Sequence, residues 1–447
     1  MSDHTATYLQ GHLAPVPDEI DAVDLVVNGT LPCELAGRYF RNGPNPRPGE
    51  DPGHLFFGHG MLHGVRLRDG RAEWYRNRWV RTRQLVENAR PFRMDGTRDL
   101  TTGSANTSVV AHGGKVFALV ESSFPCEVTD ALDTVGPCDF GGRLTTAMTA
   151  HPKEDPVTGE LHFFGYGFTP PFVTYHRLSA DGQLIASFPV DVGGPVMMHD
   201  FAITKHHVVW LDLPVLFNPE RIGRGVPYDW NDTYPSRVGV MAKDGGPVRW
   251  FEISPSYVFH VGNASEDVQG RIVLDVARYS RDGFTSTWAT MRGVASSKGG
   301  GIASNALLCR WTLDTANGLV SEQQLDDRHM EFPTVDDRLA GRSNRYLYAV
   351  DEHAIVKYDN VSGAVHRHEL GDDRHAGEAV FVPAEGGVAE DDGWLLSIAT
   401  HSDPGVPSQL LVHDATDVAA KPVATVQLPR RVPAGFHGAW VPDAGPA

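Results

Sequence analysis

Four histidines occupy similar places in the sequence, each where an apolar strand meets a turn. They are His151, His199, His260 and His437, and successive members are 48, 61 and 177 positions apart. Imidazole nitrogen is a ligand that suits zinc, copper, nickel and iron alike. Spacings this long exclude a compact zinc-finger site, whose ligands come from one short segment. If the four histidines bind one metal ion, the fold must bring distant strands to a common point.

Strands are expected to carry these histidines. Short runs rich in Val, Leu, Phe, Tyr and Trp alternate with turns that contain Gly, Asp or Asn, as in KVFALVESS, ELHFFGYGF and HHVVWLDLPV. The segments SADGQ, AKDGG, DTANG and DNVSG are typical of hairpin turns, because Gly and Asn tolerate a positive φ. Long amphipathic helical patterns are nearly absent. The sequence therefore predicts an all-β fold.

Repeated four-stranded units of about 40–45 residues would suit a β-propeller. The innermost strands of all blades meet at the axis of a propeller, so four blades could each supply one histidine to the same ion. No linker divides the chain, and we expect a single domain spanning residues 1–447. Segments 217–236 and 283–304, punctuated by Gly, Pro or Ser, are predicted to be insertions that form a lid over one face.

The net charge of −17 argues against nucleic acid as a partner, because phosphate binding requires clustered Lys and Arg. The four cysteines form no CxxC pair, and the N-terminal segment lacks the basic and apolar regions of a signal peptide. We therefore expect a cytoplasmic protein with reduced thiols.

The apolar segment Leu213–Ile222 is either a local contact with a membrane or a buried strand end with its loop. The motifs of α/β-hydrolases, P-loop proteins and HEXXH metalloproteases are absent.

Eight sequence blocks stand in order along nearly the whole chain: RNGPNP, GHGMLH, TAHPKEDPVTGELHFFGY, MMHDFAIT, FHVGNASED, EFPTVDDRLAGR, GEAVFVP and GFHGAWVP. Together they resemble the carotenoid cleavage oxygenases, a family that includes the lignostilbene and resveratrol dioxygenases. One block alone would be weak evidence, whereas eight in the family's order are specific. The resemblance implies a seven-bladed β-propeller with a non-haem Fe(II) on its axis and a lid of loops and short helices over the iron.

The resemblance also implies roles for individual residues. The four histidines match the iron ligands of the family. Three family carboxylates accept hydrogen bonds from ligand histidines, and these match Glu121, Glu331 and Glu378; one ligand histidine has no such partner. A carboxylate in this place fixes the histidine tautomer and raises the basicity of the ligand. Thr107 matches a threonine whose methyl group crowds an open coordination position.

The implied reaction is the cleavage of a conjugated C=C bond by O₂, which yields two carbonyl products. Two substrate classes remain open: carotenoids or apocarotenoids, and stilbenes or phenylpropanoid alkenes of the lignostilbene, resveratrol or isoeugenol type. Lignostilbene-type members carry a lysine immediately before the first of the three glutamates, where it meets the phenol of the substrate. Val120 occupies that position here and cannot bind a phenol, which favours the carotenoid class.

A hydrophobic conjugated alkene requires an apolar tunnel. The walls of this tunnel are predicted to include Phe56, Phe57, Phe163, Phe168, Phe172, Phe259 and Trp440. Ligand type alone does not select iron, because imidazole also suits zinc. A metal-dependent propeller hydrolase is therefore a remote alternative, although it would need carboxylate ligands on the axis. The sequence predicts no oligomeric state.

Overall fold

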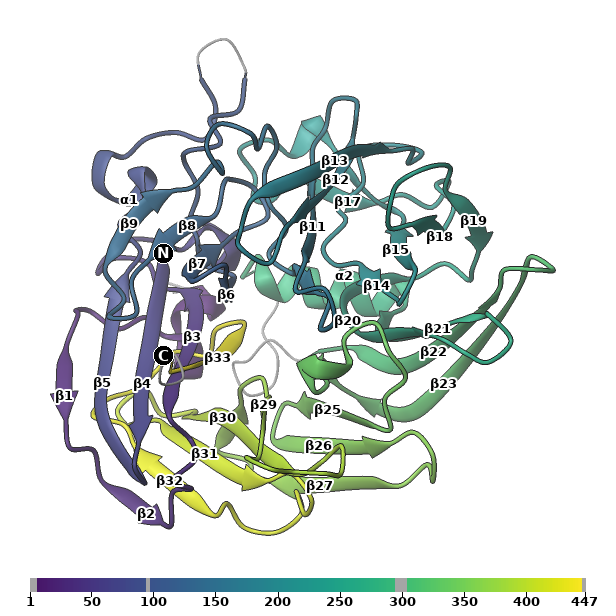
Figure 1. Ribbon diagram of the computed structural model, residues 1–447. Helices are drawn as coiled ribbons and strands as arrows, with labels where there is room; N and C mark the ends of the chain where they lie inside the picture. Colours follow the sequence, from purple (N-terminus) through teal and green to yellow (C-terminus); the bar gives the residue numbers. More distant parts are fainter. Residues whose placement is uncertain (1–5, 94–96, 294–303, 444–447) are drawn as a thin grey trace.

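Seven β-sheets are arranged as blades around a central axis (Figure 1). The computed structural model describes residues 6–93, 97–293 and 304–443. The predicted all-β, seven-bladed propeller is confirmed. Within these residues the α-helices are α1 (Arg83–Glu87) and α2 (Arg281–Met291), and the 3₁₀ turns are η1 (Thr7–Leu9), η2 (Gly11–Leu13), η3 (Leu55–Phe57), η4 (Pro219–Arg221) and η5 (Asp337–Leu339).

The blades are antiparallel sheets, and most of their strands follow one another in sequence. The first blade contains β33 (Gly438–Pro442), β3 (Gly37–Pro44), β4 (Gly60–Arg68), β5 (Arg71–Trp79) and β1 (Asp21–Val23). The second contains β6 (Ser108–His112), β7 (Lys115–Leu119), β8 (Cys126–Val128) and β9 (Thr134–Pro137). The third contains β10 (Lys153–Glu154), β11 (Leu161–Tyr166), β12 (Val173–Leu178) and β13 (Leu184–Val190). The fourth contains β14 (Ala202–Ile203), β15 (His207–Asp212), β18 (Arg237–Ala242) and β19 (Arg249–Glu252).

The remaining blades follow the same plan. The fifth contains β20 (Tyr257–Glu266), β21 (Ile272–Tyr279), β22 (Ala306–Asp314) and β23 (Leu319–His329). The sixth contains β24 (Glu331–Thr334), β25 (Tyr346–Asp351), β26 (Ala354–Asp359) and β27 (Val365–Glu369). The seventh contains β28 (Arg374–Ala376), β29 (Val380–Pro383), β30 (Gly393–His401), β31 (Gln409–Asp414), β32 (Ala424–Gln427) and β2 (Val27–Gly29).

The ring is closed at two places by strands from opposite ends of the chain. β33 pairs with β3, so that Gly438 lies opposite Arg41. β32 pairs with β2, so that Val426 lies opposite Val27. The sequence analysis did not predict either pairing, because turn signals report only strands that are adjacent in sequence. Closure brings the segment that holds His437 to the same axis as the inner strands of the other blades.

Large side chains fill the space between the blades. Between the third and fourth blades, Phe164 and Tyr175 contact Trp210 edge to face, and Trp210 stacks on Phe201 with 5.6 Å between ring centroids. All four side chains are fully buried. Burial of each contributes about 1.5–3 kcal/mol to stability. This apolar packing holds the blades together without help from the polar residues at the axis.

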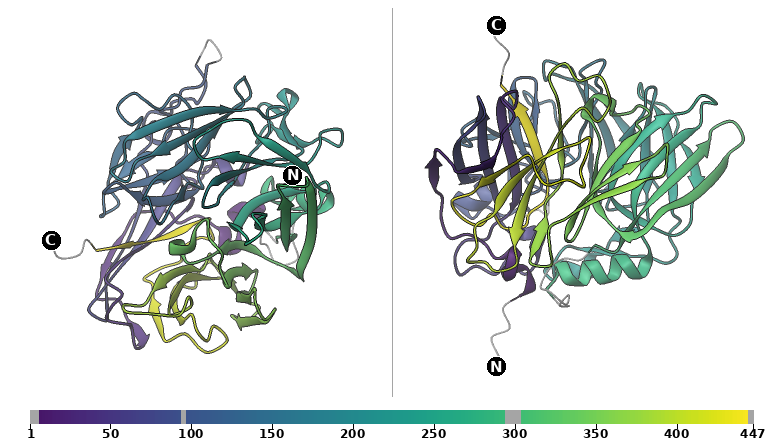
Figure 2. Two further views of the ribbon diagram at one scale, coloured as in Figure 1. Left: turned by 45° about the vertical axis from the view of Figure 1, so that its right-hand side comes forward. Right: turned by 90° about the horizontal axis from the view of Figure 1, so that it is seen from below.

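Helix α2 lies across one face of the ring (Figure 2). Its N-cap Ser280 accepts a hydrogen bond from the backbone N–H of Gly283 at 3.1 Å. Phe284 and Trp288 of the helix stack on Phe259, with ring centroids 6.0 and 6.1 Å apart. The predicted lid segment 283–304 therefore holds most of this helix, and its residues 294–303 lie outside the described part of the chain.

The other predicted lid segment, 217–236, contains η4 and β17 (Tyr228–Trp230), which pairs with β16 (Val215–Phe217) in a hairpin. Leu213 and Val215 are buried, whereas Ile222 is 65 % exposed. Within this segment the strand end is thus buried and the loop that follows is largely exposed, and contact with a membrane stays a prediction. None of the described helices is long and apolar enough to cross a bilayer.

Candidate metal centre

Every blade contributes at least one predicted site residue, and seven of the eight lie at or beside the strand nearest the axis. In blade order these are His437 before β33, Thr107 before β6, His151 before β10, His199 before β14, His260 in β20, Glu331 in β24 and Glu378 between β28 and β29. Inner strands of neighbouring blades contact one another, as β33 does with β6 and β20 does with β14 and β24. The eighth predicted residue, Glu121, follows β7.

The four histidine rings gather at the axis. The ring centroid of His151 lies 4.6 Å from that of His199, 5.0 Å from that of His260 and 4.5 Å from that of His437. The centroids of His260 and His437 are 4.8 Å apart. The Nε2 atoms of His151 and His199 are separated by 3.0 Å. The rings therefore surround one small volume, although they come from four different blades.

An irregularity in β20 exposes His260 to the axis. The pairing of β20 with β21 shifts register between Val258 and Val261, so Phe259 and His260 stand outside the regular ladder. A bulge of this kind redirects a side chain that regular pleating would place elsewhere. The buried carboxylate of Asp200 accepts a hydrogen bond from the backbone N–H of Val261 at 2.8 Å and holds the bulged strand. The sequence analysis missed Asp200, although it directly follows His199.

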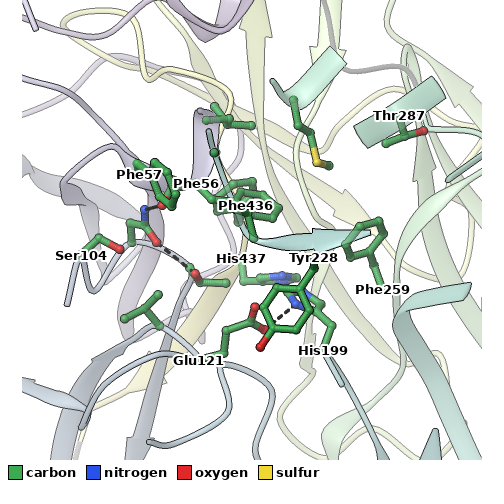
Figure 3. A pocket seen from close by; sticks show the side chains of 18 of the residues that line it. Phe56, Phe57, Ser104, Glu121, His199, Tyr228, Phe259, Thr287, Phe436 and His437 are labelled. Carbon is green, nitrogen blue, oxygen red and sulfur yellow. Dashed lines mark hydrogen bonds and ion pairs between the residues drawn. The ribbon is translucent and has the colours of Figure 1, made fainter. Parts of the chain in front are cut away.

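Three histidines are paired with the three predicted glutamates. Nδ1 of His199 lies 2.7 Å from Oε2 of Glu121 (Figure 3), and Nδ1 of His437 lies 2.9 Å from Oε1 of Glu378. Nδ1 of His260 is likewise hydrogen-bonded to Glu331. An ionised carboxylate accepts the N–H of Nδ1 and so leaves the lone pair on Nε2. Among the described residues no carboxylate bonds the ring of His151.

Each carboxylate has a second donor that fixes its orientation. The hydroxyl of Tyr166 donates to Oε1 of Glu121 at 2.7 Å, and that of Tyr279 donates to Oε1 of Glu331 at 2.8 Å. Burial, together with the neighbouring carboxylate, raises the pKa of both tyrosines well above 10, so they remain donors. The backbone N–H of Gly438 donates to Glu378 at 2.7 Å. The sequence analysis assigned no role to either tyrosine.

The donor atoms of this cluster fit a divalent metal ion. Nε2 of His260 is buried and has no hydrogen-bond partner among the described residues. Two imidazole nitrogens about 2.1 Å from one ion and at right angles lie about 3 Å apart, as the Nε2 atoms of His151 and His199 do. Burial, with a smaller effect of the neighbouring histidines, holds the pKa of His151 well below 6.5. The ring is therefore neutral and able to bind a cation.

A cavity of about 1430 Å³ opens beside the histidines. The predicted wall residues Phe56, Phe57, Phe168 and Phe259 line it, as do Val120, Thr107 and the unpredicted aromatic residues Phe217, Tyr228, Phe332 and Phe436. Figure 3 shows Phe56, Phe57, Phe259, Tyr228 and Phe436 around the cavity. Three predicted wall residues pack elsewhere: Phe163, Phe172 and Trp440 contact apolar core clusters instead. The walls of the cavity are mainly aromatic and aliphatic near the histidines.

Phe332 is the most unusual of these wall residues. Its φ of +51° is left-handed, which a bulky side chain rarely adopts. The ring lies 5.1 Å from that of His260 and 5.2 Å from that of His437, measured between centroids. Its backbone N–H also donates to Glu331 at 2.6 Å. The strained conformation thus serves both the carboxylate and the wall beside the histidines.

A family model described as retinal pigment epithelial membrane protein matches residues 13–442. A carotenoid cleavage oxygenase of Mycobacterium tuberculosis is 40 % identical, with 97 % of each chain covered. The chain belongs to the carotenoid cleavage oxygenase family. A carotenoid 9,10(9',10')-cleavage dioxygenase of Arabidopsis thaliana is 35 % identical, over 98 % of this chain and 90 % of its own.

Solved structures of carotenoid cleavage oxygenase relatives agree with the fold. A lignostilbene dioxygenase of Pseudomonas brassicacearum superposes with a TM-score of 0.85 at 27 % identity, covering 98 % of this chain and 99 % of its own. A cobalt-substituted ACO of Synechocystis superposes with a TM-score of 0.82 at 28 % identity, covering 98 % of both chains. The present family member is accordingly an oxygenase of the dioxygenase type.

Metal retention by this carotenoid cleavage oxygenase should fall as pH is lowered. Burial alone would lower the pKa of His260, but the hydrogen-bonded Glu331 carboxylate outweighs it and raises this pKa above 6.5. A proton on His260 excludes a metal from its nitrogen. We expect metal affinity to fall progressively as the pH drops toward about 6.5 and below. Metal content after dialysis at a series of pH values measures this, and full retention at about pH 5 would contradict it.

Proposed function

We propose that this chain is a non-haem Fe(II)-dependent dioxygenase that cleaves a conjugated C=C bond of a carotenoid or apocarotenoid with O₂ to give two carbonyl products. The observation that carries the proposal is a cluster of four imidazoles, three of them backed by carboxylates, at the wall of a large aromatic cavity. This donor set and this apolar space suit a redox metal acting on a hydrophobic alkene.

In this proposal the four axial histidines hold the iron. Glu121, Glu331 and Glu378 orient three of the rings and offset the positive charge that neutral imidazoles leave on the ion. Thr107 lies at the cavity wall, and its backbone carbonyl accepts a hydrogen bond from the backbone N–H of His437. In this proposal its side chain limits access to one coordination position. The bound Fe(II) would supply the activation of O₂. The aromatic walls would hold the polyene in place and keep water away from it.

Iron is proposed over zinc because oxidative cleavage requires a redox-active metal, whereas imidazole ligands alone do not discriminate between the two. A propeller hydrolase would need carboxylates as direct ligands. Here the three glutamates accept hydrogen bonds from Nδ1 of histidine and are occupied by those contacts. The hydrolase alternative is therefore disfavoured.

The carotenoid class is proposed over the phenolic class because Val120 lines the cavity, 9 % exposed, directly beside Glu121. Valine neither ionises nor hydrogen-bonds a phenol. The similarity to the carotenoid cleavage oxygenase of Mycobacterium tuberculosis supports the same class. A stilbene substrate is the second candidate, favoured by the fold similarity to lignostilbene dioxygenase and by the hydroxyl of Tyr228 at the cavity wall.

Oxygen uptake with a panel of alkenes tests the proposed reaction. The purified chain, loaded with Fe(II) under air, should consume apocarotenals or carotenoids with one O₂ per alkene and release two carbonyl products, identified by mass. Resveratrol and isoeugenol should react more slowly. Replacement Val120→Lys should shift the preference toward phenolic stilbenes. A chain that holds zinc or calcium and consumes no O₂ would overturn the proposal.

We also propose a cytoplasmic location. Cys33, Cys126, Cys138 and Cys309 are all free, which is the usual state in a reducing compartment. Cell fractionation tests this proposal, and recovery from an oxidising compartment would contradict it.

A further inference from the structure

A second group of side chains of the types that bind metal ions lines the same cavity. Glu352 and His353 stand in the turn between β25 and β26, and His375 lies in β28. One ligand atom from each of the three residues lies within 4.8 Å of the other two. The ring centroids of His353 and His375 are 4.9 Å apart. None of the three belongs to the axial histidine cluster.

The hydrogen bonds of His353 prepare it to bind a cation. Its Nδ1 lies 2.7 Å from the carbonyl oxygen of Arg374, which can only accept, so Nδ1 carries the proton. In the neutral ring the lone pair is then on Nε2. A histidine held by a backbone carbonyl in this way is the usual arrangement of a metal ligand.

His375 is buried, with 7 % of its side chain exposed, and its Nδ1 lies 3.7 Å from Oε1 of Glu352. Its Nε2 is bonded to the hydroxyl of Ser402 at 2.9 Å, which leaves Nδ1 for another partner. The ring stacks on that of His12, with 3.6 Å between centroids. His12 is only 4 % exposed, lines the same cavity, and its Nδ1 has no hydrogen-bond partner among the described residues. A buried nitrogen without a partner is costly, and this one adjoins the group.

The carboxylate of Glu352 is available to an ion. Its side chain is 33 % exposed, and no Lys or Arg nitrogen of the described residues lies within 4 Å of it; the near neighbour is His375. Ligand atoms about 2.1 Å from a tetrahedral ion lie about 3.4 Å apart. The separations of up to 4.8 Å would thus close by at most about 1.4 Å, which rotation of side chains on a turn can achieve.

We propose that Glu352, His353 and His375 form a second divalent-metal site, of the kind that binds Zn²⁺. Two imidazoles and one carboxylate select zinc and its neighbours over magnesium or calcium. Three protein ligands leave a fourth position, next to the stacked ring of His12. An ion there would border the cavity that also adjoins the axial histidines. The site does not depend on the reaction proposed above, because it uses other residues and a different ion.

Metal counting on the purified holoprotein tests the second site. The protein is equilibrated with Zn²⁺, desalted, and its zinc and axial metal are measured per chain. The number of zinc ions that each chain gains should exceed the number of axial metal ions that it loses by about one. In the double variant His353→Ala/His375→Ala this excess should disappear, while the axial metal content is unchanged. The control His366→Ala removes an exposed histidine of β27 and should retain the excess.

The variant Glu352→Gln provides a test that does not depend on correct folding of the double variant. It changes only one half-exposed side chain in a turn. Titration calorimetry should show Zn²⁺ binding at this site weakened at least about tenfold in Glu352→Gln, with an unchanged thermal unfolding midpoint. No excess zinc in the wild-type chain would overturn the proposal. So would an excess that survives both Glu352→Gln and the double replacement.

Discussion

Replacing His199 by alanine should abolish metal retention and turnover while the propeller stays folded. His199 places Nε2 at 3.0 Å from that of His151, and its Nδ1 is bonded to Glu121. The variant therefore loses one ligand and the attachment of one carboxylate. Loss of an outer partner alone typically costs about 10–100-fold in metal affinity or activity, so loss of the ligand should cost more. Metal per chain and the rate of alkene consumption measure the effect.

The fold should survive this change because the fourth blade is stabilised elsewhere. Trp210 and Phe201 of that blade are fully buried and stack on each other, and this contact does not involve His199. Circular dichroism and the thermal unfolding midpoint report on this. His206→Ala, at an exposed histidine of the same blade, is the matched control and should keep both metal and activity. Retained iron with normal turnover in the His199 variant would refute the ligand assignment.

Replacing Glu331 by glutamine should lower metal affinity or activity by about 10–100-fold. Glu331 accepts hydrogen bonds from three donors: the ring of His260, the backbone N–H of Phe332 and the hydroxyl of Tyr279. Glutamine has one acceptor oxygen in place of two, so at least one of these three donors loses its acceptor. Burial alone would raise the pKa of Glu331, but His260 and the other donors lower it, so the native group is ionised. The variant also loses this negative charge.

Two companion variants separate the role of the charge from that of the shape. Tyr279→Phe removes one donor but leaves the contact between Glu331 and His260, so its effect should be smaller than that of the glutamine replacement. Glu385→Gln changes an exposed loop carboxylate and should have no effect. Metal titration of the folded variants gives the comparison. Equal affinities of wild type and Glu331→Gln would show that this carboxylate does not support the ligand.

Local sequence features predicted much of the fold and of the histidine cluster. Alternating apolar strands and Gly- or Asn-containing turns indicated an all-β propeller, since these signals depend only on neighbouring residues. The histidines were recognised because each interrupts the end of an apolar strand. The glutamates came from the resemblance to a family, and all three lie beside histidines in the structure. Tunnel walls were predicted less well, because Phe163 and Phe172 look the same in sequence as the residues that line the cavity.

Residue types and strand periodicity along the chain were thus sufficient to indicate blades and a set of possible metal ligands. The common centre of those ligands arises only in the folded molecule. It depends on the pairing of β33 with β3, on the bulge that turns His260 inward, and on Asp200, Tyr166 and Tyr279, which hold the strand and the carboxylates. The physical reason is that strand signals act over a few residues, whereas ring closure, bulge direction and buried hydrogen bonds join residues that are far apart in the chain.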